Sequence, residues 1–358
     1  MMKESNLAEL ISRFQNHFKD FNFTLMEVCG THTHVIRKAG IHQLLPKGVR
    51  LLSGPGCPVC VTGSGYIEQA VRLSRQPQTI ITTFGDLLRV PGNTGTLAEA
   101  RAEGGQVRVV YTPLDAVEFA KAHPEVEVVF LGVGFETTAP VIALAIQTAY
   151  QQKIRNFSVL PALKVLRPAL EQLLQDPAIS LDGLIAPGHL GVIIGAKAFS
   201  FLVSKYQLPT VVTGFRPVEL WLGLTALARQ IESRRPSLEN MYPQAVSEEG
   251  NPSAKQLMKD VFIQEDTEWR GLGLVPGSGM GFNSMYRSYD ARVRFAMKPI
   301  KSEEPPGCLC GPILLGKEEP ENCPHFGGVC QPEHPVGPCM VSTEGTCAAH
   351  FYYPKSYS

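Results

Sequence analysis

Two cysteines with only two residues between them, Cys57 and Cys60, lie in the Gly/Pro-rich segment SGPGCPVC (residues 53–60). Such a pair can form a reversible disulfide, and its spacing often lowers the pKa of one thiol, so that a thiolate exists near neutral pH. The pair would also suit a structural metal clip or an exposed iron-binding site. No second CxxC lies nearby in the sequence to complete a four-cysteine zinc site, which favours redox chemistry or transient metal handling.

A second group of metal-binding residue types precedes this pair. In MEVCGTHTHVIRKAG (residues 26–40), Cys29 is followed by His32 and His34. If the segment is extended, the alternation places both imidazoles on one face of the chain. A thiol with two imidazoles suits iron or zinc, whereas the alternative is a surface turn that carries two solvated histidines.

The third group is a cysteine-rich tail. Six of the nine cysteines fall within the last 51 residues, and none lies between residues 61 and 307. Four of the six are separated by 12, 6 and 16 residues: Cys310, Cys323, Cys330 and Cys347. Four thiolates on Gly/Pro-rich loops suit a [4Fe–4S] cluster, and a four-cysteine zinc site is the alternative. The other two, Cys308 and Cys339, are spare thiols or substitutes for one of the four.

The segment GVGFETTAP (residues 132–140) is a Gly-rich turn between a predicted strand and a predicted helix. Helix N-termini bind anions, but the lysine of a P-loop and the full GxGxxG spacing are absent. Capping by the threonines with an acidic first turn is one explanation. The other is that Glu136 faces the same crevice as the front thiols, as a general acid or base.

The elements that must position these groups alternate between strands and helices. Strand–turn–helix patterns cover residues 107–124 and 126–154, and two further strands flank a helix in residues 181–215. Buried strands separated by helices indicate parallel sheets covered on both faces. The strand VRLLS before the CxxC pair and the helix predicted over residues 65–76 after it would place the thiols at the carboxyl end of a strand, where open α/β sheets bind ligands.

Two further Gly-rich segments, residues 186–195 and 275–282, are predicted to be turns after strands. His189, in the first of them, either points into the space between two lobes or is an ordinary loop histidine. Boundaries are expected near residues 180–190 and near residues 298–306, where the chain becomes charged and Pro-rich. The tail beyond is too poor in aliphatic residues to build its own core, and such segments usually need a metal or a disulfide.

The composition of the 358-residue chain limits the possible functions. Its 33 basic and 33 acidic residues give no net charge, so nucleic-acid binding is not expected. No run of 18 apolar residues suggests a membrane span, and the first 18 residues predict an amphipathic helix without the apolar core of a secretory signal. A cytoplasmic location is expected, where clustered cysteines more often bind metals or act in redox chemistry than form structural disulfides.

Several of these segments together resemble one family, the HypD maturation factors of [NiFe]-hydrogenases. The matching segments are CGTHTH (29–34), GPGCPVC (54–60), GFETTAP (134–140) and EGTCAAHF (344–351), with the cysteine spacing of the tail. The resemblance implies an α/β fold with two parallel-sheet lobes facing a cleft and a small Cys-rich iron–sulfur domain. The expected ranges are 51–182 for the first lobe, 22–50 with 183–300 for the second, and 1–21 with 301–358 for the iron–sulfur domain.

The same resemblance implies a scaffold on which iron receives two cyanides and one carbon monoxide before delivery to the hydrogenase large subunit. A small chaperone, HypC, would dock and share the iron, and HypE would hand over cyanide made with HypF. Cys29 would bind the iron opposite a cysteine of HypC, and Cys57 and Cys60 would be a redox dithiol. His32 and His34 match the family motif. The cluster ligands would be Cys310, Cys323, Cys330 and Cys347.

Releasing cyanide from a thiocyanate-like donor requires electrons, and a cluster that passes them to the Cys57–Cys60 pair would meet that need. Two other functions stay open from the sequence. A cluster-dependent dithiol/disulfide reductase without iron cargo would need Cys57 and Cys60 but not Cys29. An interaction protein stapled by zinc would show no redox chemistry.

Overall fold

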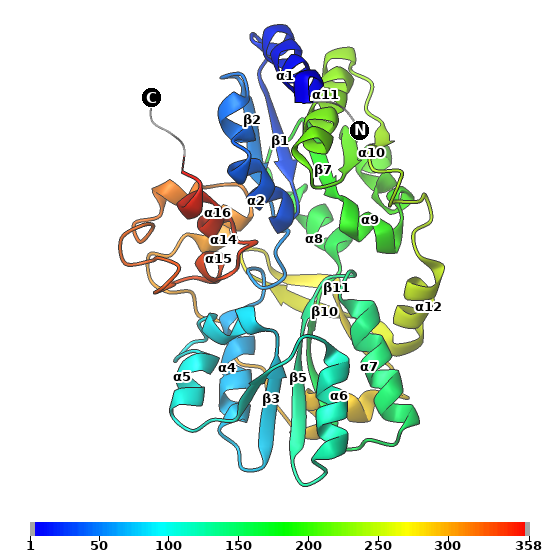
Figure 1. Cartoon of the computed structure of the whole chain (residues 1–358), viewed down its shortest axis with the longest axis vertical. Coiled ribbons are helices and arrows are strands. Elements are labelled where there is room, and N and C mark those ends of the chain that lie inside the picture. The colour runs from blue at the N-terminus through cyan, green and yellow to red at the C-terminus, as the bar shows by residue number, and fades with distance from the viewer. Residues whose placement is uncertain (1–3, 355–358) are drawn as a thin grey trace.

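The computed structural model describes residues 4–354, which form two α/β lobes with the cysteine-rich tail, residues 301–354, at their side (Figure 1). In the described residues, no helix is long and apolar enough to cross a membrane. The predicted α/β class with parallel sheets is confirmed.

The upper lobe in Figure 1 contains a five-stranded parallel sheet of order β2-β1-β7-β8-β9. Its strands are β1 (Phe23–Glu27), β2 (Val49–Ser53), β7 (Gly183–Pro187), β8 (Thr210–Thr213) and β9 (Leu238–Asn240). The helices of this lobe are α1 (Glu4–Phe18), α2 (Gly30–Lys38), α3 (Ile41–Leu44), α9 (Gly188–Ile194), α10 (Ser200–Tyr206) and α11 (Pro217–Ser233). Because all five strands are parallel, the turns after β1, β2 and β7 meet at one edge of the sheet.

The lower lobe contains a four-stranded parallel sheet of order β4-β3-β5-β6. The strands are β3 (Thr79–Thr83), β4 (Val107–Val109), β5 (Glu127–Gly134) and β6 (Phe157–Leu163). Its helices are α4 (Ser64–Ser74), α5 (Leu97–Ala102), α6 (Pro113–Ala122) and α7 (Ala139–Gln151). α8 (Leu166–Leu173) follows β6 and lies toward the upper lobe in Figure 1. β5 and β6 are buried along almost their whole length; the apolar sequence of β5 predicted this strand, whereas β6 was not predicted.

A long antiparallel hairpin, β10 (Phe262–Trp269) and β11 (Gly273–Phe282), follows α12 (Pro252–Val261) and lies between the two sheets in Figure 1. The prediction of a turn over residues 275–282 is wrong, because this segment pairs with β10 over most of its length. Met280 and Phe282 bury their side chains in the core. Glycine content alone therefore did not indicate a turn here.

Two of these elements bear on the expected domain ranges. β2 spans the expected boundary at residue 51 and pairs with β1. β11 lies within residues 183–300 but packs against β6 of the other lobe, and it also packs against α8. The tail has only short helices, α14 (Cys310–Leu314), α15 (Pro338–Val341) and α16 (Thr346–Tyr352), preceded by α13 (Ala291–Arg294). α16 packs on α2, which brings the tail to the sheet edge that carries Cys29 (Figure 1).

Candidate metal and dithiol site

Cys29 lies at the carboxyl edge of the five-stranded sheet, directly between β1 and α2. Its backbone is extended, with φ −155° and ψ 119°, and it is the residue that caps α2. The side chain is buried, and the backbone N–H donates to Oε2 of Glu27 at 2.8 Å. Burial, with the nearby Glu27 carboxyl, raises the pKa of the Cys29 thiol far above its usual value. A cation would have to displace the thiol proton to bind here.

The expectation of an extended chain over residues 29–34 is wrong, because α2 begins at Gly30. Its buried positions include His32, Thr33 and Ile36, and their spacing of three and four residues is that of a helix packed on one side. Residues two apart on a helix point to different sides. His32 is therefore buried, whereas His34 is half-buried with its ring edge-on to Tyr353 at 5.3 Å.

His32 joins α2 to the end of β8. Its Nε2 lies 3.0 Å from the carbonyl oxygen of Gly214 and 3.1 Å from Oγ1 of Thr213. Burial lowers the pKa of His32 to about 4, so the ring is neutral and its Nε2–H can donate to the carbonyl. These contacts give His32 a role in fixing the helix beside Cys29.

A histidine from a distant part of the sequence lies next to Cys29. His189, at the start of α9 just after β7, has its ring nitrogens 3.8 and 3.9 Å from Sγ of Cys29. Burial lowers the pKa of His189 to about 4, so the imidazole is neutral and able to bind a metal. The ring stacks on Phe215, with centroids 5.1 Å apart. The only hint of this position in the sequence was the segment PGH, residues 187–189, at the end of a buried strand.

The dithiol loop, residues 54–63, follows β2, the strand beside β1. Cys57 and Cys60 form a disulfide, and both are buried. The loop passes close to Cys29, since a Cβ atom at Gly56 would lie only 2.2 Å from the Cys29 backbone nitrogen. The Gly30 N–H also points to the carbonyl oxygen of Gly56 at 3.4 Å. The thiol pair thus lies in a loop that follows a strand, as the sequence predicted, and Gly56 of this loop lies against Cys29.

The tail brings its cysteines together. Sγ of Cys310 lies 2.8 Å from Sγ of Cys339, and the Cys339 side chain also contacts that of Cys347. Cys323 and Cys330 lie close enough to Cys347 to interact with it electrostatically. Five of the six tail cysteines are buried, and Cys308 is partly exposed. Cys310 and Cys339 are therefore adjacent, and the other predicted ligands lie in the same part of the tail.

Burial and neighbouring thiols change the pKa values of the tail cysteines. Burial, with the neighbouring Cys310, raises the pKa of Cys308 to about 12. Burial and the adjacent thiols Cys310 and Cys347 raise the pKa of Cys339 well above its usual value. A buried set of soft sulfur donors is the chemistry that an iron–sulfur cluster or a zinc ion requires. The residues present therefore fit a bound metal group.

Arg270 joins the dithiol loop to the tail. Its Nε donates to the carbonyl oxygen of Cys60 at 3.1 Å, and its Nη2 donates to that of Thr62 at 3.2 Å. Its Nη1 pairs with Glu304. Sγ of Cys60 also lies 4.0 Å from the carbonyl oxygen of Pro338, the residue before Cys339. The disulfide thus contacts the tail at Pro338, the residue directly before Cys339.

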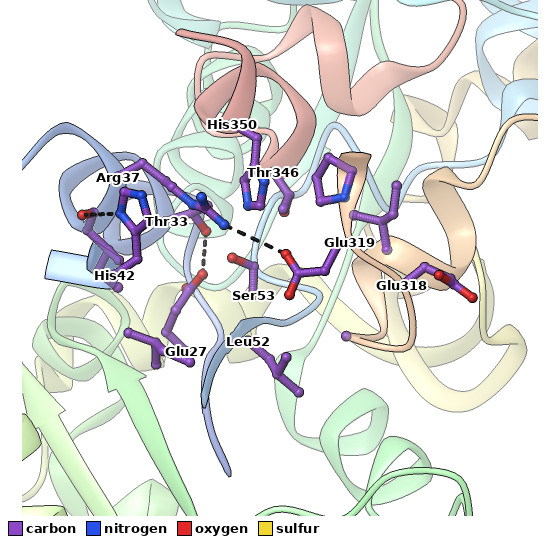
Figure 2. Close-up of a pocket in the computed structure, with 15 residues that line it drawn as sticks. Glu27, Thr33, Arg37, His42, Leu52, Ser53, Glu318, Glu319, Thr346 and His350 are labelled. Carbon is purple, nitrogen blue, oxygen red and sulfur yellow. Dashed lines mark hydrogen bonds and ion pairs between the residues drawn. The ribbon is translucent and has the colours of Figure 1, made fainter. Parts of the chain in front are cut away.

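A small polar cavity lies between α2 and the tail (Figure 2). Glu27 lines it and accepts a hydrogen bond from Oγ1 of Thr33, and burial raises the pKa of Glu27 to about 7. Arg37 reaches across to Glu319 at 3.7 Å. His350 is 2.9 Å from Glu321. The cavity has room for about one water molecule, and the Arg37–Glu319 pair links α2 to the tail.

Glu136 lies in the other lobe, in the turn between β5 and α7. Its Oε1 accepts from the backbone N–H of Leu166 at 3.2 Å, and Oε2 has no hydrogen-bond partner among the described residues. Burial raises the pKa of Glu136 to about 7. In the described part of the chain, no hydrogen bond or ion pair links Glu136 to Cys29 or to the disulfide. Its proposed acid–base role stays a prediction.

Comparison with known proteins extends over nearly the whole chain. The HypD family model, described as "Hydrogenase formation hypA family", matches residues 4–354. A hydrogenase maturation factor HypD of Escherichia coli K12 is 42% identical over 359 residues, which covers 98% of this chain and 96% of the relative. The HypD of Cupriavidus necator is 40% identical over 367 residues, covering 99% and 97%. That of Azotobacter vinelandii is 41% identical over 340 residues, covering 93% and 90%.

Proposed function

The chain belongs to the HypD family of hydrogenase maturation factors, and we propose that it holds an iron ion at Cys29 while the Fe(CN)₂CO group is assembled. The observation that carries this proposal is the meeting of Cys29, His189 and the Cys57–Cys60 pair at one edge of a parallel sheet. A thiolate and a neutral imidazole are suitable ligands for iron. A cysteine of a HypC-type chaperone would supply a further ligand from outside.

The Cys57–Cys60 pair would release cyanide from its carrier. A thiocyanate donor on a HypE-type partner, R–S–CN, can react with two thiols to give R–SH, HCN and one disulfide. The C–S bond breaks, one S–S bond forms, and the two thiol protons go to the products. Iron at Cys29 would capture the cyanide within the same site, because the Gly56 backbone brings the dithiol loop against Cys29.

The disulfide must be reduced before the next cyanide arrives, and the tail fits a group that supplies electrons. A [4Fe–4S] cluster would provide single electrons when bound. Cys323, Cys330 and Cys347 would hold it together with Cys310 or Cys339, whose sulfurs are neighbours. Pro338 brings this part of the tail against Cys60. The completed iron group would then pass to the hydrogenase large subunit.

The test is a metal and sulfide count on protein prepared anaerobically with its HypC-type partner. We expect about four irons matched by acid-labile sulfide, plus additional iron that is lost in Cys29→Ala. Cys308→Ala, which changes a partly exposed tail thiol, should keep the additional iron. A cluster without Cys29-dependent iron would instead support a dithiol reductase without cargo, and zinc without sulfide would contradict both functions.

A further inference from the structure

One buried charge lies between the dithiol loop and the tail, and the chemistry proposed above does not use it. Arg270 directly follows β10, and its side chain is 1% exposed. Three of its groups hold the dithiol loop: the backbone N–H donates to the carbonyl oxygen of Val61 at 2.9 Å, and the guanidinium donates to those of Cys60 and Thr62. The loop is therefore fixed around a positive charge.

The same guanidinium faces the tail. Burial disfavours its charge, but the neighbouring Cys310, Glu304 and Cys339 together raise the pKa of Arg270 above its usual value. Arginine is always protonated in proteins, so this charge is permanent. Glu304, which is 45% exposed, offsets only part of it because water screens an exposed carboxylate.

We propose that Arg270 is a positioning residue that sets the reduction potential of the Cys57–Cys60 pair. This inference rests on the proposed function, in which the pair is a redox dithiol. Reduction breaks the S–S bond, adds two electrons and takes up two protons, or one proton where one sulfur remains a thiolate. Where one sulfur remains a thiolate, negative charge develops at that sulfur, and a fixed cation at the Cys60 backbone stabilises this reduced form.

The experiment measures this potential directly, in the full-length chain with and without a reconstituted cluster. The protein is equilibrated anaerobically in buffers of reduced and oxidised dithiothreitol, and its thiols are trapped by differential alkylation. Trypsin cleavage after Arg50 and Arg72 then gives a peptide, residues 51–72, whose only cysteines are Cys57 and Cys60. Mass spectrometry of this peptide reports the pair without interference from the tail thiols.

Arg270→Gln should lower the equilibrium constant for reduction of the pair about tenfold, which is about 30 mV toward more negative potential. Arg270→Lys keeps the charge and should recover most of this difference. Glu304→Gln removes the partly screened carboxylate and should shift the potential in the opposite direction. This surface variant keeps the test valid even if Arg270→Gln folds poorly.

Arg37→Gln is the matched control, because Arg37 is also a buried arginine that contacts the tail, through Glu319 rather than through the dithiol loop. It should leave the potential of the pair unchanged. An unchanged potential in Arg270→Gln would overturn the inference. Equal shifts in the Gln and Lys variants would also overturn it, since loop geometry rather than charge would then set the potential. The dithiothreitol measurement needs no iron at Cys29, so its failure is distinct from failure of the proposed function.

Discussion

Burial disfavours the charged forms of the side chains around Cys29. Burial raises the pKa of the Glu27 carboxyl to about 7 and lowers the pKa of both His32 and His189 to about 4. Desolvation is the largest cause in each case, because the sheet edge is covered by α2, α9 and the tail. A neutral imidazole beside a buried thiol is ready to bind a metal without first losing a proton.

Among single residues, removal of the His189 side chain should weaken iron binding. We expect His189→Ala to lower the affinity for the Cys29-dependent iron by at least about tenfold, since even a residue that only supports a metal ligand commonly contributes that much. Competition with a chromophoric iron chelator under anaerobic conditions measures it, with acid-labile sulfide followed to exclude cluster loss. His34→Ala, on another side of α2, is the control. Equal affinities in the two variants would contradict a role for His189.

Glu136 makes a prediction about stability. Its folded-state pKa of about 7 is above its unfolded value of 4.5, so between these pH values the folded protein binds a proton that the unfolded chain does not. Stability contributed by this group is therefore lost as pH rises. The free energy of unfolding should fall by about 3 kcal/mol more in the wild type than in Glu136→Gln over this range. Urea unfolding at several pH values tests it.

Glu118→Gln, an exposed position on α6, is the control for that comparison and should follow the wild type. Parallel stability curves for the wild type and Glu136→Gln would show that Glu136 is ionised in the folded protein across the whole range. That result would also remove the main reason for considering it as a general acid or base.

At the scale of elements, the sequence predicted the strands and helices better than it predicted which of them lie next to one another. The apolar run of β5 was predicted, because burial of a strand on both faces leaves a direct trace in its sequence. The strand before the CxxC pair was also predicted, whereas β6 was not. The Thr/His alternation in residues 31–34 wrongly suggested an extended chain. The helical spacing of the buried residues in α2 is seen only when Thr33, Ile36 and Arg37 are considered together.

The contacts across the site could not be predicted in the same way. β7 pairs with β1 although about 155 residues separate them in the chain, and only that pairing brings His189 to Cys29. Arg270 stands in a hairpin that carries no motif, yet it bonds to the Cys60 carbonyl. The sequence also could not decide which tail cysteines are metal ligands, because only the fold places Cys339 beside Cys310.

The turn after β2 yields a prediction at this scale. In Gly56→Ala the added methyl would meet the Cys29 backbone nitrogen at 2.2 Å, so the loop or α2 must move. We expect a loss of about 1–3 kcal/mol in the free energy of unfolding and a loss of the Cys29-dependent iron. Gly85→Ala is the matched control, because a Cβ there meets only Val109 at 3.8 Å. Unchanged stability and iron content in Gly56→Ala would show that the dithiol loop does not need this close approach.

At the scale of the whole molecule, three parts of the chain converge on one place. The upper sheet supplies Cys29 and His189, the turn after β2 supplies the dithiol, and the tail supplies its cysteines. Arg37 pairs with Glu319 (Figure 2), and Thr31 donates to Glu344 at 2.7 Å, so α2 itself holds the tail in position. This arrangement supports the proposal that one site binds iron, releases cyanide and recovers its thiols.

The most direct test of this account is infrared spectroscopy of the anaerobic complex with the HypC-type and HypE-type partners. The wild type should show cyanide and carbon monoxide stretches of bound iron, and Cys29→Ala should lose both with the iron itself. The double variant Cys57→Ala/Cys60→Ala should keep its Cys29-dependent iron but lack the cyanide stretches. Cyanide stretches of wild-type intensity in the double variant would contradict the central claim that the dithiol releases cyanide beside the iron.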